Sequence, residues 1–329
     1  MFDLRLDEIV EWIRGKGLSS VAVQLPEGLK VRALEIADHI FSKAGVPVTI
    51  LGDPCYGSCD VRGSHRKIAD GLVHFGHAHM PSVPVDENVL FIEATVDVDV
   101  DEGISRIAPS LPERIGLLAT VQYIGALNDA KRSLEARGKK VVIGKGDPRL
   151  KYDGQVLGCN YSAAESVADE VDCFLFIGEG EFHPLAAALG IKKELFMFNP
   201  LTYELRAVTE SRDRIMRKRF ATIEKAKQAD SFLVIECMKP GQRRTAVADD
   251  MMRKIIAAGK KAYKLSLYDV TPEWLLAYRV DAYVSTACPR LAMDESARFE
   301  KPILTPPEAE IVLGIREWED YRFDAIRDQ

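Results

Sequence analysis

Three cysteines in turn-rich loops are the residues of this sequence best suited to chemistry. Cys59, Cys159 and Cys288 each lie in a loop next to an apolar segment. Thiolates bind metals, but the distances between these cysteines along the chain match neither zinc-ribbon nor ferredoxin spacing. Two interpretations therefore stay open at this point. The three cysteines are ligands of one metal centre, or they are inert thiols in hydrophobic surroundings.

Two of the remaining cysteines are less suited to metal binding, and the third is harder to interpret. Cys173 and Cys237 lie beside strongly apolar segments, which favours buried and unreactive thiols. Cys55 precedes Cys59 in the stretch Cys55-Tyr-Gly-Ser-Cys59, but no third cysteine follows two residues later. The CxxxCxxC triplet of the usual radical enzymes is therefore absent.

Three thiolates from three separate segments would suit a 4Fe–4S cluster. Thiolates are soft donors that match iron–sulfur chemistry. Three of them leave one iron of the cluster without a protein ligand, and a substrate could then bind that iron directly. Such a cluster would be a reagent as well as an electron carrier.

The elements that would position these cysteines repeat one plan three times. Short apolar strands alternate with helices, and the first strands of the repeats begin near residues 21, 115 and 232. Helices are expected at 6–13 and 29–40, and a long one at 203–228. Strands are expected at 20–25, 47–51, 71–75, 88–93, 114–121, 140–143, 172–177, 194–198, 232–236, 262–266 and 281–285.

This alternation predicts the α/β class, with small, mostly parallel sheets covered by helices. We expect three similar domains, at residues 1–107, 108–201 and 202–329, which carry Cys59, Cys159 and Cys288 in that order. Ligands of open α/β sheets bind beyond the carboxyl ends of the strands, where these loops are expected. The three domains would then surround a central iron–sulfur cluster.

Composition and charge exclude several classes of protein. Hydrophobic residues make up 47% of the chain and charged residues 29%, which is typical of a folded globular protein. The net charge of −6 gives no reason to expect nucleic-acid binding. No apolar run is long enough to span a membrane, and the acidic start does not resemble a signal peptide. We therefore expect a cytoplasmic protein that binds neither nucleic acid nor membrane.

Eight short stretches, in order along nearly the whole chain, resemble the iron–sulfur subunit of diphthamide synthase in its archaeal form. These stretches are Gln24-Leu-Pro-Glu-Gly-Leu29, Asp53-Pro-Cys-Tyr-Gly-Ser-Cys-Asp60, His74-Phe-Gly-His77, Thr120-Val-Gln-Tyr123, Gly178-Glu-Gly-Glu-Phe-His183, Gly241-Gln-Arg-Arg244, Cys288-Pro-Arg-Leu291 and Lys301-Pro-Ile-Leu-Thr-Pro306. The resemblance implies that Cys59, Cys159 and Cys288 are the ligands of a 4Fe–4S cluster. It also implies a homodimer.

The activity that this resemblance implies is a non-standard radical reaction. S-adenosylmethionine would bind the open iron as cosubstrate, and its bond between sulfur and the γ-carbon would break. The 3-amino-3-carboxypropyl group would then add to C2 of a histidine in translation elongation factor 2, which is the first step of diphthamide biosynthesis. The chain would thus be a transferase that needs an electron donor. The missing CxxxCxxC triplet agrees with this departure from the usual route.

Several loop residues are candidates for binding S-adenosylmethionine. The turn formed by Pro26, Glu27 and Gly28 has backbone N–H groups that could bind a carboxylate or phosphate, although a simple turn explains it equally well. Polar or flexible residues near other strand ends could bind the methionine part, and arginine matches a carboxylate well. The other candidates are Gln122, Glu179, Gly180, Gln242, Arg243 and Arg290.

Four histidines could suggest a second metal site, but we expect structural roles for them. They are His74, His77, His79 and His183. Two other functions stay open. The chain could resemble quinolinate synthase, which is a 4Fe–4S enzyme that condenses and dehydrates its substrates. It could also be a non-catalytic electron-transfer subunit. Formation of methylthioadenosine from S-adenosylmethionine distinguishes the transferase from both.

Overall fold

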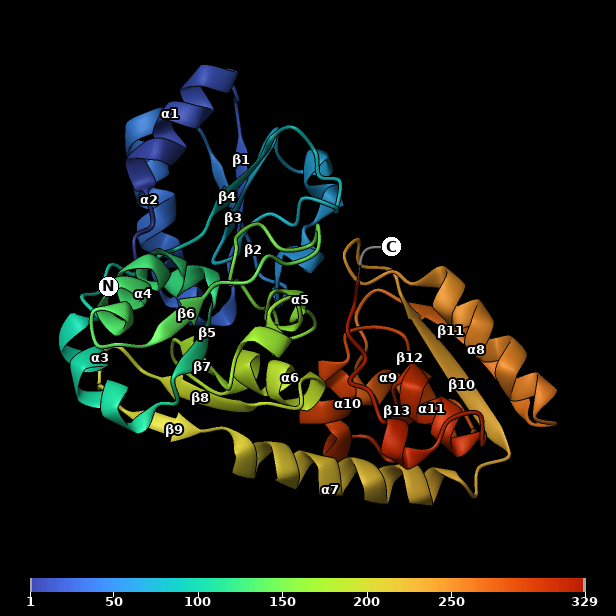
Figure 1. Cartoon of the computed structure of the whole chain (residues 1–329). Coiled ribbons are helices and arrows are strands. Elements are labelled where there is room, and N and C mark those ends of the chain that lie inside the picture. Colours follow the sequence, from blue (N-terminus) through green and yellow to red (C-terminus); the bar gives the residue numbers. More distant parts are fainter. Residues whose placement is uncertain (1, 328–329) are drawn as a thin grey trace.

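The structure is a computed structural model, and it describes residues 2–327. Over these residues the chain forms three separate sheets (Figure 1). Within each sheet the strands are parallel, except for one antiparallel edge strand in the second sheet. The predicted α/β class is therefore confirmed, with small and mostly parallel sheets that carry helices.

The first sheet has the strand order β2-β1-β3-β4. Its strands are β1 (Val21–Gln24), β2 (Val48–Leu51), β3 (Gly71–Phe75) and β4 (Val89–Ile92). Its helical elements are α1 (Leu6–Lys16), η1 (Glu27–Arg32), α2 (Ala33–Ala44), η2 (Ser58–Asp60) and η3 (Gly63–Lys67). Helix α1 buries Ile9, Val10 and Ile13 on one face, and Gly17 ends it with a φ of 63°. Figure 1 shows α1 beside α2.

The second sheet has the order β6-β5-β7-β8-β9. Its strands are β5 (Arg114–Ala119), β6 (Lys140–Val142), β7 (Cys173–Ile177), β8 (Glu194–Phe198) and β9 (Leu205–Ala207). The helical elements around it are α3 (Asp101–Ile107), η4 (Ala108–Ser110), η5 (Val121–Ala126), α4 (Leu127–Glu135), α5 (Ser162–Glu165), η6 (Ala168–Glu170) and α6 (Phe182–Gly190). Strand β7 is buried along its whole length, as expected for a central strand of a covered parallel sheet.

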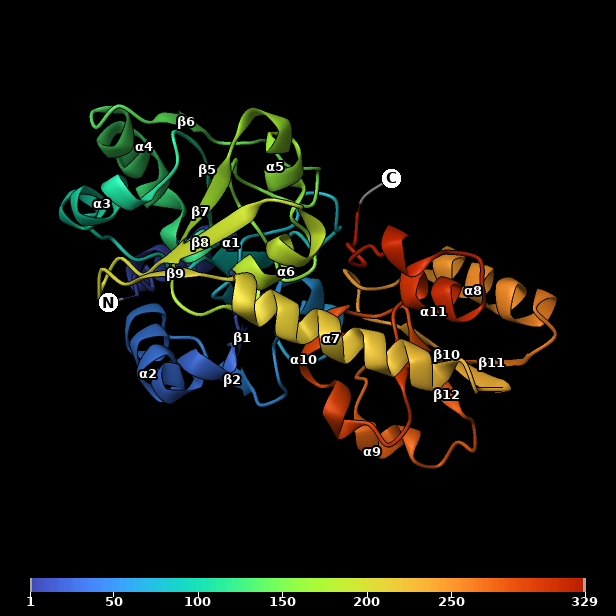
Figure 2. The same ribbon diagram turned by 60° about the horizontal axis from the view of Figure 1, so that its bottom comes forward.

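The third sheet has the order β11-β10-β12-β13. Its strands are β10 (Ser231–Cys237), β11 (Lys261–Leu267), β12 (Ala282–Ser285) and β13 (Ile303–Leu304). Its helical elements are α7 (Thr209–Ala226), α8 (Thr245–Ala257), α9 (Pro272–Leu275), α10 (Arg290–Asp294), η7 (Ser296–Arg298), α11 (Pro306–Val312) and η8 (Trp318–Asp320). Figures 1 and 2 show α7 running from the end of β9 toward the third sheet.

The first four strands of each repeat follow the same order in space. In each sheet the first strand is central, the second lies on one side of it, and the third and fourth lie on the other side. The order in which strands are added to the sheet therefore reverses between the first and third strands. The carboxyl ends of such strands form the usual ligand-binding crevice of an open α/β sheet.

Most expected elements are present, but the expected start of the long helix at 203–228 was wrong. Helix α7 begins only at Thr209, and β9 (Leu205–Ala207) precedes it. The side chains of β9 suit a helix as well as a strand, and pairing with β8 decides between them. The two-residue strand β13 was not predicted, because so short a segment has no detectable alternation.

Two elements beside the predicted domain boundaries pack with the second sheet. Helix α3 lies within the predicted first domain, yet Ile104 belongs to the hydrophobic core around β5 and β7. Strand β9 lies within the predicted third domain and pairs with β8. The boundaries at 107/108 and 201/202 themselves stay a prediction.

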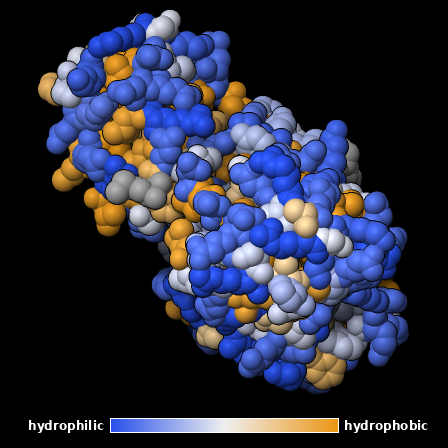
Figure 3. All heavy atoms as spheres, turned by 60° about the vertical axis from the view of Figure 1, so that its left-hand side comes forward, coloured by the Kyte–Doolittle hydropathy of each residue, from blue (hydrophilic) through white to orange (hydrophobic). Residues whose placement is uncertain are grey.

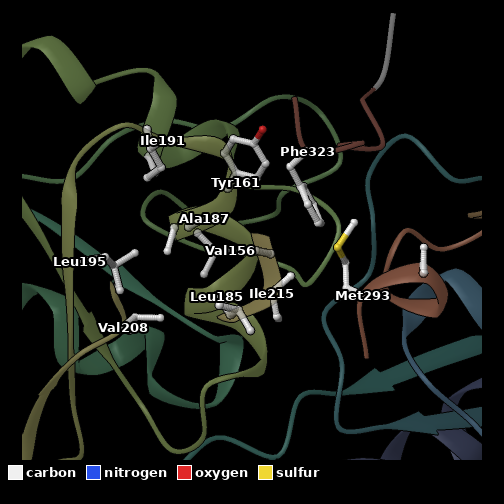
Figure 4. Close-up of a cluster of buried hydrophobic side chains, with 14 of the residues drawn as sticks. Val156, Tyr161, Leu185, Ala187, Ile191, Leu195, Val208, Ile215, Met293 and Phe323 are labelled. Atoms are coloured by element: carbon white, nitrogen blue, oxygen red, sulfur yellow. The ribbon is translucent and has the colours of Figure 1, made fainter. Parts of the chain in front are cut away.

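The second and third sheets share one hydrophobic cluster, which fixes their relative position. It contains Phe174 and Leu185 from the second sheet and α6, and Ile235 and Tyr283 from the third sheet. Met293 and Phe323 belong to the same cluster as Leu185 and Ala187 of α6 (Figure 4). Burial of apolar side chains on both sides stabilises this arrangement by about 25 cal/mol for each Å² removed from water.

The surface in Figure 3 is mostly hydrophilic, with hydrophobic side chains in several separate groups. Some of the most exposed hydrophobic residues lie on η1 and α2, including Val31, Leu34 and Phe41. Among residues 2–327, no helix has both the length and the hydrophobicity that crossing a membrane requires.

Candidate metal centre

The three loop cysteines lie in loops that connect elements of three different sheets. Cys59 lies in η2, between β2 and β3, and Cys159 lies in the loop between β6 and α5. Cys288 lies between β12 and α10. Cys159 is buried, and the other two are partly exposed. The loops are beyond the carboxyl ends of parallel strands, as predicted, although Cys288 follows the third strand of its sheet rather than the second.

Gln242 joins the Cys59 loop to the Cys288 loop. Its Nε2 donates a hydrogen bond to Sγ of Cys59 at 3.2 Å. Its Oε1 accepts one from the backbone N–H of Cys288, also at 3.2 Å. The Gln242 side chain is 7% exposed. One buried amide thus contacts two of the three cysteines and holds their loops side by side.

The segment before Gln242 packs tightly on the Cys59 loop. The backbone N–H of Gly241 donates to the Cys59 carbonyl at 3.1 Å. A Cβ atom at Gly241 would lie 2.5 Å from the Cys59 Cα, so only glycine fits here without movement. Lys239 is buried and pairs with Asp60 and Asp269, each at 2.7 Å. These contacts fix the first sheet's cysteine against the third sheet.

Cys159 is held against the end of the third segment. Its carbonyl accepts a hydrogen bond from the backbone N–H of Ile326 at 2.8 Å. The neighbouring Asn160 donates from Nδ2 to the Ile326 carbonyl at 2.9 Å, and its side chain is fully buried. The Cys159 loop is therefore fixed by residues that lie far away in the sequence.

Arg149 connects the Cys159 loop to the segment that packs on the Cys59 loop. Its Nη2 donates to the Gly241 carbonyl at 2.8 Å, and the side chain is only 5% exposed. Its buried Nε has no hydrogen-bond partner, and among the described residues Arg149 forms no ion pair. A buried guanidinium without a counter-ion is costly, which indicates that a negatively charged group belongs beside it.

The three thiols influence one another electrostatically. Burial raises the pKa of the Cys288 thiol well above its ordinary value, and the nearby Cys159 and Cys59 raise it further. Burial also raises the pKa of Cys159 to about 11, although the Arg149 guanidinium acts in the opposite direction. Without a metal, these thiols would therefore stay protonated at neutral pH. A metal ion supplies the positive charge that stabilises buried thiolates.

This arrangement fits a 4Fe–4S cluster. The donor set is three soft thiolates, with no carboxylate among them, as iron–sulfur clusters prefer. The unpaired guanidinium of Arg149 would compensate part of the negative charge that three thiolates bring to the cluster. Sequence reasoning missed Arg149. The signal was a single arginine in the loop after β6, ten residues before Cys159.

Arg290 is a second predicted residue that lies beside a cysteine loop. Its Nε and Nη2 donate to Asp294, each at 2.7 Å. The guanidinium lies over the Phe182 ring, at 4.2 Å from the centroid. Its buried Nη1 has no partner among the described residues. The N–H donors of Nη1 therefore remain for a ligand, two residues after Cys288 in the sequence.

Gln122, Glu179 and Gly180 lie where the first and second sheets meet, or on the surface beside this contact. The Gln122 Nε2 donates to the backbone carbonyls of Gly76 and Glu93, at 2.8 and 3.2 Å. Glu179 is exposed and accepts a hydrogen bond from the Tyr123 hydroxyl at 2.8 Å. Gly180 has a φ of 75° and open space around its Cα.

The other candidates have contacts of their own. Glu27 and Gly28 are exposed at the start of η1, and Glu27 pairs with Lys30 at 2.6 Å. Pro26 precedes them and packs near Gly76. Arg243 is exposed, and its Nε donates to Thr245 Oγ1 at 3.3 Å. No hydrogen bond or ion pair among the described residues joins these four to the cysteine loops.

Cys173 and Cys237 are buried, as expected of inert thiols, and Cys55 is buried as well. Cys173 belongs to β7. Cys237 is the last residue of β10, and its thiol donates a hydrogen bond to the Tyr268 carbonyl. Cys55 is different, because it lies beside His74 and His77.

Burial and nearby Arg290 and His77 lower the pKa of His183 to about 3, so this imidazole is neutral at neutral pH.

Comparison with known proteins agrees with this geometry. The family model described as "Putative diphthamide synthesis protein" matches residues 25–322. The 2-(3-amino-3-carboxypropyl)histidine synthase of Pyrococcus horikoshii is 36% identical, over 99% of this chain and 94% of the relative. Subunit 1 of the corresponding synthase of Gallus gallus is 28% identical, over 100% of this chain and 81% of that protein.

A solved structure has the same fold throughout. The crystal structure of Dph2 from Pyrococcus horikoshii with a 4Fe–4S cluster superposes with a TM-score of 0.91 at 36% sequence identity. The match covers 99% of this chain and 95% of the other. With the family model and this relative in agreement over nearly the full length, the chain belongs to the family of diphthamide synthesis proteins.

Proposed function

We propose that this chain transfers the 3-amino-3-carboxypropyl group of S-adenosylmethionine to C2 of a histidine in translation elongation factor 2. In this proposal, Cys59, Cys159 and Cys288 hold a 4Fe–4S cluster. The chain is therefore proposed to be the transferase of the first step of diphthamide biosynthesis. Its relatives carry the name of this activity, which supports the proposal.

The observation that carries the proposal is the contact between three cysteine loops that lie far apart in sequence. Gln242 contacts Cys59 and Cys288, while Arg149 bridges from the Cys159 side to Gly241. Three unrelated core thiols would have no reason to share these partners. A common metal centre accounts for all of the contacts.

When bound, the cluster would supply an electron and one iron that is open to S-adenosylmethionine. The chain's own residues would act around it. Gln242 would donate its N–H to the Cys59 sulfur, and Arg149 would offset negative charge. The buried hydrophobic cluster shared by the second and third sheets would keep water from one side of the site.

Among the predicted contacts to S-adenosylmethionine, Arg290 has the strongest support. Its unpartnered Nη1 could donate to the carboxylate of the transferred group, while Asp294 holds the guanidinium in place. Gln242 lies against the Cys59 sulfur and would be close to any ligand of the open iron. Contacts from Gln122, Glu179, Gly180, Arg243 and the turn at Pro26 stay predictions.

The proposal extends to partners. Elongation factor 2 is the protein substrate, a reductant supplies the electron, and two copies of the chain form a homodimer in the cytoplasm. The negative net charge agrees with the expectation that nucleic acid is not bound directly.

The test is an anaerobic reaction of the reduced, cluster-loaded chain with S-adenosylmethionine and elongation factor 2. We expect methylthioadenosine, together with a mass gain on one histidine of the factor. The Cys159→Ala variant should give neither product, whereas Cys173→Ala, a matched buried cysteine, should give both. Methylthioadenosine without the mass gain would reject the proposed acceptor. Absence of both products with the loaded wild-type chain would reject the transferase and leave the electron-transfer alternative.

A further inference from the structure

A second group of metal-binding side chains lies at the carboxyl end of the first sheet. One ligand atom each from Cys55, His74 and His77 lies within 4.8 Å of the other two. Cys55 is in the loop after β2, His74 is in β3, and His77 follows the same strand. None of these residues has a part in the proposed reaction. From the sequence we expected structural roles for the two histidines, because nothing in it indicated that a cysteine lies beside them.

The fold positions these side chains at the crevice between β1 and β3. Parallel pairing sets Gln24 of β1 opposite His74 of β3. The chain then turns at Gly76, whose φ of 79° is left-handed, and this turn brings His77 back over the strand end. As a result, Nε2 of His74 lies 3.0 Å from Nδ1 of His77.

Hydrogen bonds determine which nitrogen of His74 is available. The Gln24 Nε2 donates to the Asp60 carbonyl at 2.7 Å, which leaves Oε1 as the acceptor end of that amide. His74 Nδ1 lies 3.0 Å from this Oε1 and therefore carries the proton. The lone pair of His74 Nε2 then points toward His77. Metal-bound histidines typically donate their other ring N–H to a carbonyl oxygen in this way.

The surroundings keep both histidines in the form that binds metals. Burial lowers the pKa of His74 well below its ordinary value and lowers the pKa of His77 to about 4. Both imidazoles are therefore neutral at neutral pH, as metal ligands must be. His74 is fully buried, whereas His77 is partly exposed.

We propose that Cys55, His74 and His77 form a zinc site that is separate from the three cysteines assigned to the cluster. Two imidazoles and one thiolate are a donor set that zinc binds readily, and three protein ligands leave one coordination position for water or another small ligand. The ion would bind Nε2 of His74 and Nδ1 of His77 and would replace the present contact between these two nitrogens. Gln24 would not bind the ion itself, but its hydrogen bond with His74 Nδ1 would orient the ring.

The first test measures zinc and iron together in the anaerobically purified full chain from zinc-supplemented cells. We expect about one zinc per chain in addition to the cluster iron. The Cys55→Ala and His77→Gln variants should lose at least nine-tenths of the zinc. Cys237→Ala and His79→Gln are matched controls and should keep it, since Cys237 and His79 bond to backbone carbonyls elsewhere.

The second test removes interference from the cluster cysteines, because three vacated thiols would themselves bind zinc. Cobalt(II) is added to the Cys59→Ser/Cys159→Ser/Cys288→Ser variant, whose folding is checked by circular dichroism. We expect a sulfur-to-cobalt charge-transfer absorption that disappears when Cys55→Ala is added. The Gln24→Leu change should weaken cobalt binding about 10- to 100-fold.

A wild-type chain that contains its cluster but less than a tenth of a zinc per chain would overturn the proposal. Zinc that persists in Cys55→Ala would also overturn it. If the triple variant fails to fold, the metal content of the single variants still decides. These results do not depend on group transfer, so the zinc site and the proposed activity can fail independently.

Discussion

Gln242 Nε2 lies 3.2 Å from the Sγ of Cys59, and the other end of the same amide accepts the backbone N–H of Cys288. The two cysteines lie in loops of the first and third sheets. This side chain therefore links two loops that are far apart in the sequence. Hydrogen bonds to cluster sulfurs stabilise the reduced, more negative state of an iron–sulfur centre. Gln242 holds the two loops together, and with the proposed cluster bound it would also affect the potential of that cluster.

Replacing Gln242 with Leu keeps the side-chain size and removes both hydrogen bonds. We expect the midpoint potential of the cluster to fall by about 60 mV, the one-electron equivalent of a tenfold change in the reduction equilibrium. The measurement is a redox titration followed by electron paramagnetic resonance. Gln228→Leu, on an exposed loop, is the control. A potential that is equal in both variants would show that the N–H···S contact has no electronic role.

Gly241→Ala should damage the site through packing alone. The new Cβ would lie 2.5 Å from the Cys59 Cα and 2.6 Å from its Cβ, so the loops must move apart. Overpacking of this kind destabilises proteins by about 1–3 kcal/mol. We expect lower cluster content after anaerobic reconstitution and a lower urea midpoint of the cluster-free chain. Gly63→Ala, where nothing lies within 4 Å, should behave as wild type. Normal loading of both variants would contradict the close contact.

Arg149→Met should lower the potential further than Gln242→Leu, because it removes a whole positive charge from a buried position. The side chain is 5% exposed, so solvent screens its charge poorly. Arg149→Lys keeps the charge and should recover part of the potential. The same redox titration measures all three. If Arg149→Met has the wild-type potential, the charge-compensating role of Arg149 is wrong.

Stability should depend on pH through His183. Its pKa is about 3 in the folded chain, because burial disfavours the charged imidazole and nearby Arg290 and His77 add to the effect. In the unfolded chain the pKa is near 6.5. Between these values the unfolded state binds a proton that the folded state does not. The free energy of unfolding should therefore fall as pH falls below 6.5, by up to about 1.4 kcal/mol per pH unit from this residue.

Urea unfolding of the cluster-free chain at several pH values between 7.5 and 5 measures this dependence. The difference between the wild type and His183→Gln isolates the histidine from the carboxylates that titrate in the same range. We expect the wild type to lose its stability more steeply. Parallel curves for the two proteins would mean that His183 is accessible to protons in the folded state.

The fold was largely predictable because buried parallel strands are continuous apolar runs. Strands such as 71–75 and 173–177 are buried along their whole length, so hydrophobicity alone located them. Strand β9 was not predictable, because its identity comes from pairing with β8 and not from its own residues. Helix α7 was consequently expected to begin six residues too early.

The site was predictable only in part. The loops of Cys59, Cys159 and Cys288 followed from strand ends, and the family resemblance connected them. Arg149 was missed because its position ten residues before Cys159 does not reveal its contact with Gly241, which lies in the third segment. The group of Cys55, His74 and His77 was missed for a similar reason. It needs the register of β1 with β3 and the turn at Gly76, and neither is visible in a single sequence.

The proposed 4Fe–4S cluster needs Cys59, Cys159 and Cys288 together. The most direct measurement is the iron and acid-labile sulfide content of each Cys→Ala variant after anaerobic reconstitution. We expect about four irons and four sulfides per chain in the wild type and in Cys173→Ala. Each of the three ligand variants should lose most of both, because two thiolates retain such a cluster poorly. Full iron and sulfide content in Cys159→Ala would show that Cys159 is not a cluster ligand.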